Sequence, residues 1–222
     1  LRALPALFSH NLSILRLGRN QLLTVPSTLS RATSLQELEL QHNFITELPS
    51  SFEFRRLGKL VLAYNQLRTL PLAVFDCRQL THFDLSKNYI TNVSEAISQL
   101  TNLRYLNASS NLLKGLPAGI GQLTLLSELV LDHNRLTSLH SNIGKLELLA
   151  KMPLFNNCLE ELPDEFCKLT RLDEINLAFN RLRTLPANFG QLTHLERVRM
   201  TISKSIIAHN NNALDILGWQ ST

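Results

Sequence analysis

Eight asparagines recur along the chain at a nearly constant spacing, and their amides are its most regular polar groups. An asparagine amide donates and accepts hydrogen bonds at once. Each follows a mostly apolar run, as Asn65 does within LVLAYNQLRTLP, residues 60–71. A buried amide can satisfy backbone groups where a chain turns without a strand partner, so the spacing predicts a structural ladder of stacked amides. Its members lie 22 or 23 residues apart: Asn20, Asn43, Asn65, Asn88, Asn111, Asn134, Asn157 and Asn180.

The other side chains capable of chemistry do not converge. His42 and His133 lie four of these intervals apart, roughly 19 Å if successive intervals stack like neighbouring strands. Asp84 and Asp132 lie two intervals apart, about 10 Å on the same basis. No Cys and His residues have the spacing of metal ligands, and there is no glycine-rich phosphate loop. The sequence therefore predicts no enzyme, no cofactor and no metal site.

A repeated frame, LxxLxLxxNxL, positions the amides. Alternating leucines are typical of a short strand that buries one side. Strands 23 residues apart cannot form hairpins, so we expect parallel pairing through crossover segments and one core shared by stacked repeats. The eight copies are LSILRLGRNQL, LQELELQHNFI, LGKLVLAYNQL, LTHFDLSKNYI, LRYLNASSNLL, LSELVLDHNRL, LAKMPLFNNCL and LDEINLAFNRL. A ninth, LERVRMTISKS, keeps only the apolar half.

The second half of most repeats opens with a proline, usually after a leucine. Seven of the eight prolines stand there, where a fixed φ suits the first residue of a helical turn, and Ser94 and His140 replace proline in two repeats. The eighth, Pro153, falls inside an expected strand, where its missing N–H predicts a kink or bulge.

We therefore expect an α/β fold, a curved right-handed solenoid with a parallel β-sheet on its concave face and short helical or 3-10 turns on its convex face. Residues 1–202 would form about nine repeats after a partial first one. Residues 203–222 leave the repeat and would form a C-terminal cap or tail over the end of the core.

The consensus LxxLxLxxNxLxxLPxxIGxLxxL at 23 residues resembles the leucine-rich-repeat proteins over nearly the whole chain. It is most similar to their intracellular Ras-group class. It differs from the plant receptor-kinase class, which has tGxIP where this chain has LP, and it lacks the cysteine caps of extracellular vertebrate members. The resemblance implies a protein-binding platform, often in signalling, with a small GTPase or another signalling protein as partner.

The residues between the leucines are expected to line the concave face in four columns. The first column alternates in charge at several neighbours, Glu37 and Lys59 among them, as expected of a solvated ladder. Exposed aromatic rings on such a face are typical anchors of interfaces. Phe155 and Phe179 come from adjacent repeats and form the predicted hot spot, unless the rings only shield the edge of the solenoid. The predicted partner-binding residues are Tyr64, Tyr105, Val130, Asp132, Phe155 and Phe179.

Composition narrows the functional class. Hydrophobic residues make up 44% and charged residues 18%, which indicates a folded chain. The net charge of +4 without a Lys/Arg cluster favours no nucleic acid, and no apolar run is long enough for a membrane span. Three scattered cysteines, Cys77, Cys158 and Cys167, favour a reducing compartment and have packing explanations.

The leading hypothesis is a cytoplasmic protein–protein interaction scaffold in signal transduction. One alternative is the extracellular ectodomain of a receptor or adhesion protein, and another is the recognition domain of a larger signalling enzyme. The glycosylation sequons at Asn11, Asn92 and Asn107 do not decide between them, because the composition predicts roughly three by chance. The chain begins at Leu1, which suggests a fragment of a longer protein.

Overall fold

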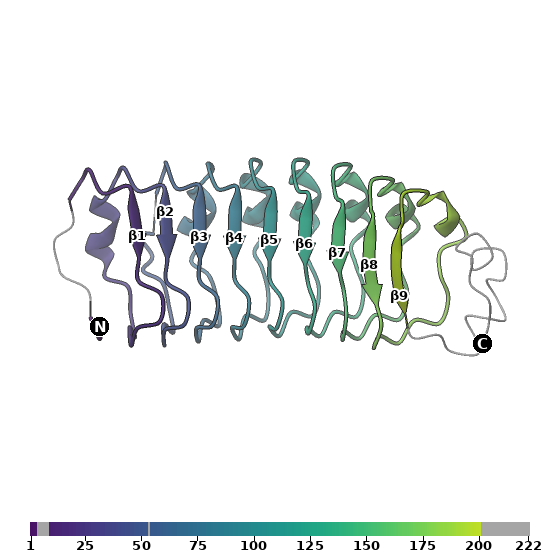
Figure 1. Ribbon diagram of the computed structural model, residues 1–222, viewed down its shortest axis with the longest axis horizontal. Helices are drawn as coiled ribbons and strands as arrows, with labels where there is room; N and C mark the ends of the chain where they lie inside the picture. Colours follow the sequence, from purple (N-terminus) through teal and green to yellow (C-terminus); the bar gives the residue numbers. More distant parts are fainter. Residues whose placement is uncertain (4–8, 53, 201–222) are drawn as a thin grey trace.

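The computed structural model describes residues 1–3, 9–52 and 54–200, and it shows nine parallel strands in one sheet (Figure 1). The strands follow the order of the sequence without exception, so each repeat lies beside the next. They are β1 (Ile14–Arg16), β2 (Glu37–Glu39), β3 (Lys59–Val61), β4 (His82–Asp84), β5 (Tyr105–Asn107), β6 (Glu128–Val130), β7 (Lys151–Pro153), β8 (Glu174–Leu177) and β9 (Arg197–Met200). This curved leucine-rich-repeat solenoid confirms the predicted fold class. The predicted cap at 203–222 lies outside the described residues.

The strands are short because only the LxL segment of each frame is extended. Its central residue is buried in every strand from β2 to β8, whereas the two residues that flank it point toward solvent. Neighbouring strands pair in register at the repeat spacing, as Leu38 with Leu60 and Leu106 with Leu129. The alternation in the sequence therefore becomes two faces of one sheet.

Short 3-10 helices form the opposite face of the solenoid, behind the strands in Figure 1. Proline precedes most of them, but as the capping residue: Pro117, for example, has φ −68° and ψ 155°, so it lies just outside the helix. Ser94 and His140 occupy the proline position in two repeats. Each side chain accepts a hydrogen bond from the backbone N–H of the residue two positions later in the sequence. The helices are η1 (Ser27–Arg31), η2 (Leu72–Asp76), η3 (Glu95–Gln99), η4 (Ala118–Gln122), η5 (Ser141–Lys145), η6 (Asp164–Lys168) and η7 (Phe189–Gln191).

The one 22-residue repeat loses its residue on the helical face. Pro49 follows Pro26 by the usual interval, but Leu57 comes one residue early after Leu35. The described residues between Pro49 and Leu57 form turns and no 3-10 helix. Phe52 and Phe54 are both buried there and meet edge to face, with ring centroids 4.8 Å apart. Two large rings thus fill the space of the missing turn.

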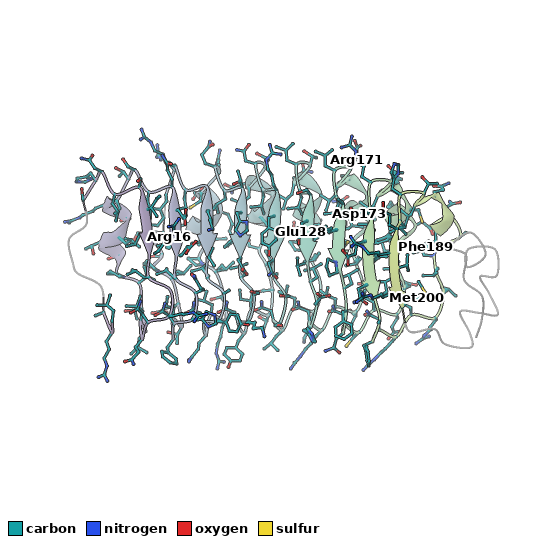
Figure 2. The ribbon with its side chains drawn as sticks, in the orientation of Figure 1. Arg16, Glu128, Arg171, Asp173, Phe189 and Met200 are labelled. Carbon is teal, nitrogen blue, oxygen red and sulfur yellow. The ribbon has the colours of Figure 1, made fainter. Side chains whose placement is uncertain are left out.

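The core is one continuous stack of leucines from both halves of the repeats. Leu38, Leu60 and Leu106 of the strands are at most 2% exposed, and Phe189 of η7, labelled in Figure 2, is fully buried at the C-terminal end. Cys77 occupies a leucine position of this core and is buried. Burial of this kind is the main source of stability, since each repeat shares its apolar surface with two neighbours.

Candidate functional site

The sheet face at its N-terminal end carries a network of ion pairs. The Arg16 guanidinium donates to Glu37 at 2.7 Å, and the Lys59 ammonium donates to Glu39 at 2.6 Å. The hydrogen bond from Arg16 is the main reason that the pKa of Glu37 falls to about 2. The predicted neighbours Glu37 and Lys59 also lie within ion-pair distance, at 3.5 Å, although the two shorter contacts join other pairs. Figure 2 shows Arg16 on β1 at this end and Glu128 further along on β6.

The middle of the face carries a stacked histidine and tyrosine. His82 of β4 and Tyr105 of β5 lie with ring centroids 4.2 Å apart and an interplanar angle of 5°. Burial lowers the pKa of His82 and raises the pKa of Tyr105, so both rings favour the neutral form. Tyr105, one of the predicted binding residues, is therefore half-buried against its neighbour.

The C-terminal half of the face carries an aromatic cluster. Phe155 and Phe179 meet edge to face with centroids 5.2 Å apart, and His133 meets Phe155 in the same way at 5.1 Å. Phe179 is 66% exposed, and Phe155 is partly buried. Val130 ends β6 and Pro153 ends the neighbouring β7, both half-exposed on the same face. We call Val130, Pro153, Phe155 and Phe179 the apolar patch.

Asp132 stabilises the backbone of this patch. Its Oδ1 accepts a hydrogen bond from the Phe155 N–H at 2.7 Å. In other repeats the equivalent N–H donates to the side chain two positions before it in the sequence. The Ser86 N–H donates to Asp84, and the Ser109 N–H donates to Asn107. Pro153 has no such side chain, so Asp132 reaches across from the preceding repeat. Burial raises the pKa of Asp132 above its ordinary value, against the opposing effect of the Phe155 hydrogen bond.

Pro153 loosens the sheet without breaking it. Only Glu128 and Lys151 pair in register between β6 and β7, whereas all other neighbours pair over three or four residues. Backbone hydrogen bonding between these two repeats resumes directly after β6, where the Leu131 N–H donates to the Pro153 carbonyl at 3.0 Å. The spacing remains 23 residues on both sides, so no residue is inserted and the predicted bulge is absent.

The fourth predicted column consists of the residues directly before the ladder asparagines, and it does not belong to the strands. Tyr64 and Phe179 lie beyond the ends of β3 and β8, in the left-handed region with φ of 56° and 57°. That region costs a bulky side chain conformational energy. Every repeat with a ladder asparagine has the same conformation directly before it: Arg19, His42, Tyr64, Lys87, Ser110, His133, Asn156 and Phe179. The column therefore follows the bend where the chain leaves the sheet.

Tyr64 is held between its neighbours on this bend. His42 stacks on its ring at a centroid distance of 4.0 Å, and the Lys87 ammonium lies 4.9 Å from the ring centroid. Those two residues come from the preceding and the following repeat, so Tyr64 lies apart from the apolar patch. The six predicted binding residues thus separate into two sets. Val130, Asp132, Phe155 and Phe179 lie near β6 to β8, whereas Tyr64 and Tyr105 lie apart from them, each stacked on a histidine.

The ladder asparagines join each repeat to the one before it. The Asn111 amide donates to the Leu85 and Ala108 carbonyls at 3.0 and 3.2 Å, and its Oδ1 accepts from the Ile90 N–H at 3.0 Å. Six asparagines, from Asn43 to Asn157, are buried, while the terminal pair, Asn20 and Asn180, is partly exposed. The amides therefore replace a strand partner for backbone that has none.

A shallow recess near Arg55 and Arg56 was not predicted. Its volume is about 1070 Å³, and Lys59 and His82 also line it, together with Gly58, which contributes no side chain. It lies beside the 22-residue repeat. The shorter spacing of that repeat is the only feature of the sequence that could have indicated the recess. Among the described residues no group of three or more His, Cys, Asp or Glu side chains is placed to hold a metal ion.

The cysteines are packing residues in this arrangement. Cys77 and Cys167 are buried, and Cys158 is partly exposed beside the ladder. Burial raises the pKa of Cys167 to about 11, which leaves its thiol protonated and unreactive near neutral pH.

Comparison with known proteins establishes the family. A family model described as leucine rich repeat matches residues 55–113 and 124–182, and a second model of that description matches residues 34–54. The chain belongs to the leucine-rich-repeat family. Such proteins generally mediate protein–protein interactions, and their fold is typically a binding scaffold without catalytic activity.

The relatives of this leucine-rich-repeat chain are diverse. A stretch of 65 residues is 42% identical to part of Toll-like receptor 10 of Bos taurus, which covers 29% of this chain and 8% of the receptor. The plant peptide hormone receptor RGFR1 in complex with RGF2 is similar in structure, with a TM-score of 0.70 and 26% identity over 85% of this chain and 36% of that one.

A bacterial protein shares the fold at lower identity. The internalin inlF from Listeria monocytogenes has a TM-score of 0.75 and 20% identity over 92% of this chain and 60% of its own. The chain thus spans less than two thirds of each of these proteins. In the described part of this chain, no helix has both the length and the apolar character needed to cross a membrane.

Proposed function

We propose that the chain is a scaffold that binds a partner protein on its concave face, with the apolar patch at β6 to β8 as the anchor. The observation that carries the proposal is the edge-to-face pair of Phe155 and Phe179, because Phe179 remains 66% exposed beside it. A large exposed ring that the core does not use supports a role in contact with a partner.

The surroundings of the patch favour a protein ligand. Asp132 holds the Phe155 backbone in place, and His133 packs against its ring, so the patch is preorganised. Preorganised aromatic anchors lose little conformational entropy on binding. The paired charges at the N-terminal end of the face would contribute mainly to orientation and association rate.

The test is the double variant Phe155→Ala and Phe179→Ala, compared with Leu72→Ala. Leu72 of η2 is also 66% exposed but lies on the opposite face, so it is a matched control. Partners are identified by proximity labelling on the intact protein, and their affinities are then measured with purified components. We expect the double variant to weaken binding at least about tenfold, since hot-spot residues each contribute about 2 kcal/mol or more. A partner bound equally by all three proteins would remove the patch from the interface.

The cellular setting is part of the same proposal. The 23-residue consensus supports membership of the intracellular Ras-group class, with a cytoplasmic role in signal transduction and a small GTPase or another signalling protein as partner. No catalytic step is assigned to this chain. It would serve as the recognition part of a larger assembly.

A receptor ectodomain is the second candidate, and the stretch shared with Toll-like receptor 10 favours it. Asn11 and Asn92 are exposed and open to glycosylation, whereas Asn107 of β5 is half-buried and its Oδ1 accepts from the Ser109 N–H. Mass spectrometry of the full-length protein from its native cells separates the two settings. Glycans on Asn11 or Asn92 support the ectodomain, and unmodified asparagines there support the cytoplasmic scaffold.

A further inference from the structure

The bend between the sheet and the descending chain forms a second surface, distinct from the concave face. It follows the carboxyl ends of the strands, the lower edge of Figure 1 to which the arrows point. Three positions in each repeat face solvent here: directly before the ladder asparagine, directly after it, and three residues after it. We call these positions in the first six repeats, from Arg19 to Thr137, the turn flank.

The turn flank carries positive charge without negative charge. Five cations occupy its positions in these six repeats, and no Asp or Glu does. The nearest acids in sequence are Glu47, one position further along, and Asp132, directly before His133, while Glu160 stands at the equivalent position of the seventh repeat. None of the five forms an ion pair with a described acidic side chain, and all are exposed. They are Arg19, Arg68, Lys87, Lys114 and Arg135.

The strands present a different electrostatic pattern. Five acids and five cations occupy the outward positions of β1 to β9, and several of them pair, as Arg197 does with Glu174 at 3.1 Å. The charge on the concave face is therefore balanced and partly neutralised. The turn flank is the surface where uncompensated charge collects, so a partner there is selected by sign.

Exposed aromatic rings lie among these cations. Phe44, Tyr64 and Tyr89 are 47%, 43% and 52% exposed, and none of them belongs to the core. Phe44 and Tyr89 directly follow ladder asparagines, two repeats apart, with Tyr64 on the repeat between them. Rings between unpaired cations form a surface that favours acidic groups alternating with apolar ones.

We propose that the turn flank is a docking surface for an extended, acidic polypeptide segment with aromatic or aliphatic side chains. Six stacked repeats extend roughly 24 Å, which about seven extended residues would span. Carboxylates of that segment pair with the flank cations, and its apolar side chains cover Phe44 and Tyr89. The flank meets the apolar patch only where His133 packs against Phe155. The cations Arg68, Lys114 and Arg135 are not part of that patch, so variants of the two sites can be compared separately.

The ring geometry favours a polypeptide over single-stranded nucleic acid. Nucleobases bind by stacking on a free aromatic face. His42 covers one face of Tyr64, and the Lys87 ammonium lies over the ring, so no open platform is left there. A lipid surface is disfavoured because the rings are about half-exposed and separated by polar residues such as Gln66, which leaves no continuous apolar band to insert.

The test uses a fluorescein-labelled peptide of about ten residues that alternates glutamate and tyrosine, with fluorescence anisotropy at low salt. The flank variant is Arg68→Glu, Lys114→Glu and Arg135→Glu, three side chains without hydrogen bonds or ion pairs to described residues. Its control is Lys145→Glu, Lys168→Glu and Arg171→Glu, which changes the net charge equally on the helical face; Figure 2 shows Arg171 at the opposite edge.

We expect the flank variant to weaken peptide binding at least about tenfold and the control to change it less than about twofold. Added salt should weaken binding to the unmodified protein, because exposed charges are screened. The double variant Phe155→Ala and Phe179→Ala should bind the peptide as before, so a failure of the concave-face proposal would not affect this result.

Three outcomes would overturn the proposal. One is equal weakening by the flank and control variants, which indicates a response to net charge alone. Another is the absence of peptide binding to the unmodified protein at millimolar concentration. The third is tighter binding of oligo-dT or of phosphatidylserine vesicles than of the peptide, which assigns the flank to nucleic acid or to a membrane surface.

Discussion

At the scale of single residues, the asparagine amides replace the hydrogen bonds that a bend removes from the backbone. Each buried ladder residue bonds to its own repeat and to the preceding one, as Asn111 does with Ala108 and Leu85. The residue before each asparagine has a left-handed backbone conformation that lets the chain turn there. This conformation costs free energy in a residue other than glycine, and it occurs at eight positions. A ligand-free structural role thus explains the most regular polar residues of the sequence.

The first prediction concerns the ladder. Asn111→Leu should lower the free energy of unfolding by about 2–4 kcal/mol, because buried backbone groups lose their partners. Asn180→Leu removes the same kind of bonds at a partly exposed site, where water can replace them, and should cost clearly less. Urea denaturation of both variants measures the difference. Equal losses at the two sites would show that burial does not set the cost.

The second prediction concerns Asp132. Its folded-state pKa is raised by burial, so its charge destabilises the fold above that pKa, and the penalty disappears as pH falls through it. Asp132→Asn keeps an acceptor for the Phe155 N–H and should be more stable than the unmodified protein at pH 7, with the advantage shrinking toward pH 4. Asp132→Ala removes the acceptor and should cost about 1 kcal/mol. Thermal unfolding across this pH range tests both, and a constant advantage of Asp132→Asn would contradict the pKa argument.

At the scale of secondary-structure elements, the 3-10 helices set how closely successive repeats approach on the helical face. Gly121 of η4 lies against η5, where an added Cβ would stand 2.6 Å from the Asn142 carbonyl oxygen. Gly144 of η5 meets Glu165 of η6 in the same way. The strands are held at one spacing by backbone hydrogen bonds. The helices instead meet through side chains, as where the Asn142 amide of η5 donates to the Ala118 carbonyl of η4 at 3.0 Å.

The third prediction follows from that contact. Gly121→Ala should destabilise the fold by about 1–3 kcal/mol, because the backbone of η5 must move to admit the methyl group. Gly115→Ala is the matched control: an added Cβ there meets no atom within 4 Å, so stability should stay the same or rise by up to about 1 kcal/mol. Chemical denaturation compares the two. A tolerated Gly121→Ala would mean that the helices shift freely.

At the scale of the whole molecule, stability is distributed along one dimension. Each repeat contacts only its neighbours, so the central repeats are supported on both sides, while the outer ones are supported less completely. The same arrangement separates two surfaces, a charge-balanced concave face with an apolar patch and a basic turn flank. A single stack of repeats can therefore present two chemically different surfaces to partners.

The fourth prediction is that opening begins at the ends. The Leu106 amide of β5 should exchange with solvent more slowly than the Leu15 amide of β1, which is partly exposed, with opening free energies that differ by at least about 1 kcal/mol. Native-state hydrogen exchange read by mass spectrometry measures both segments. Equal protection along the sheet would indicate one cooperative unit instead of a chain of coupled repeats.

The repeat made most of this fold predictable from the sequence. The period of 23 residues and the alternating leucines were enough to predict parallel strands, a shared core and the position of the asparagine ladder in each repeat. These features depend on the repeated pattern alone. The pattern also placed Phe155 beside Phe179, since they occupy nearly equivalent positions in adjacent repeats. It predicted the proline positions to within one residue, although proline proved to be a cap.

Only the tertiary structure decided what depends on neighbours in space. Asp132 reaches the Phe155 N–H of the next repeat, Tyr64 lies between His42 and Lys87, and the fourth column turns out of the sheet. Periodicity cannot show these features, because a period states which residues are equivalent and not which conformation or partner each one takes. The uneven charge of the turn flank emerged for the same reason: its positions become one surface only when the repeats are stacked.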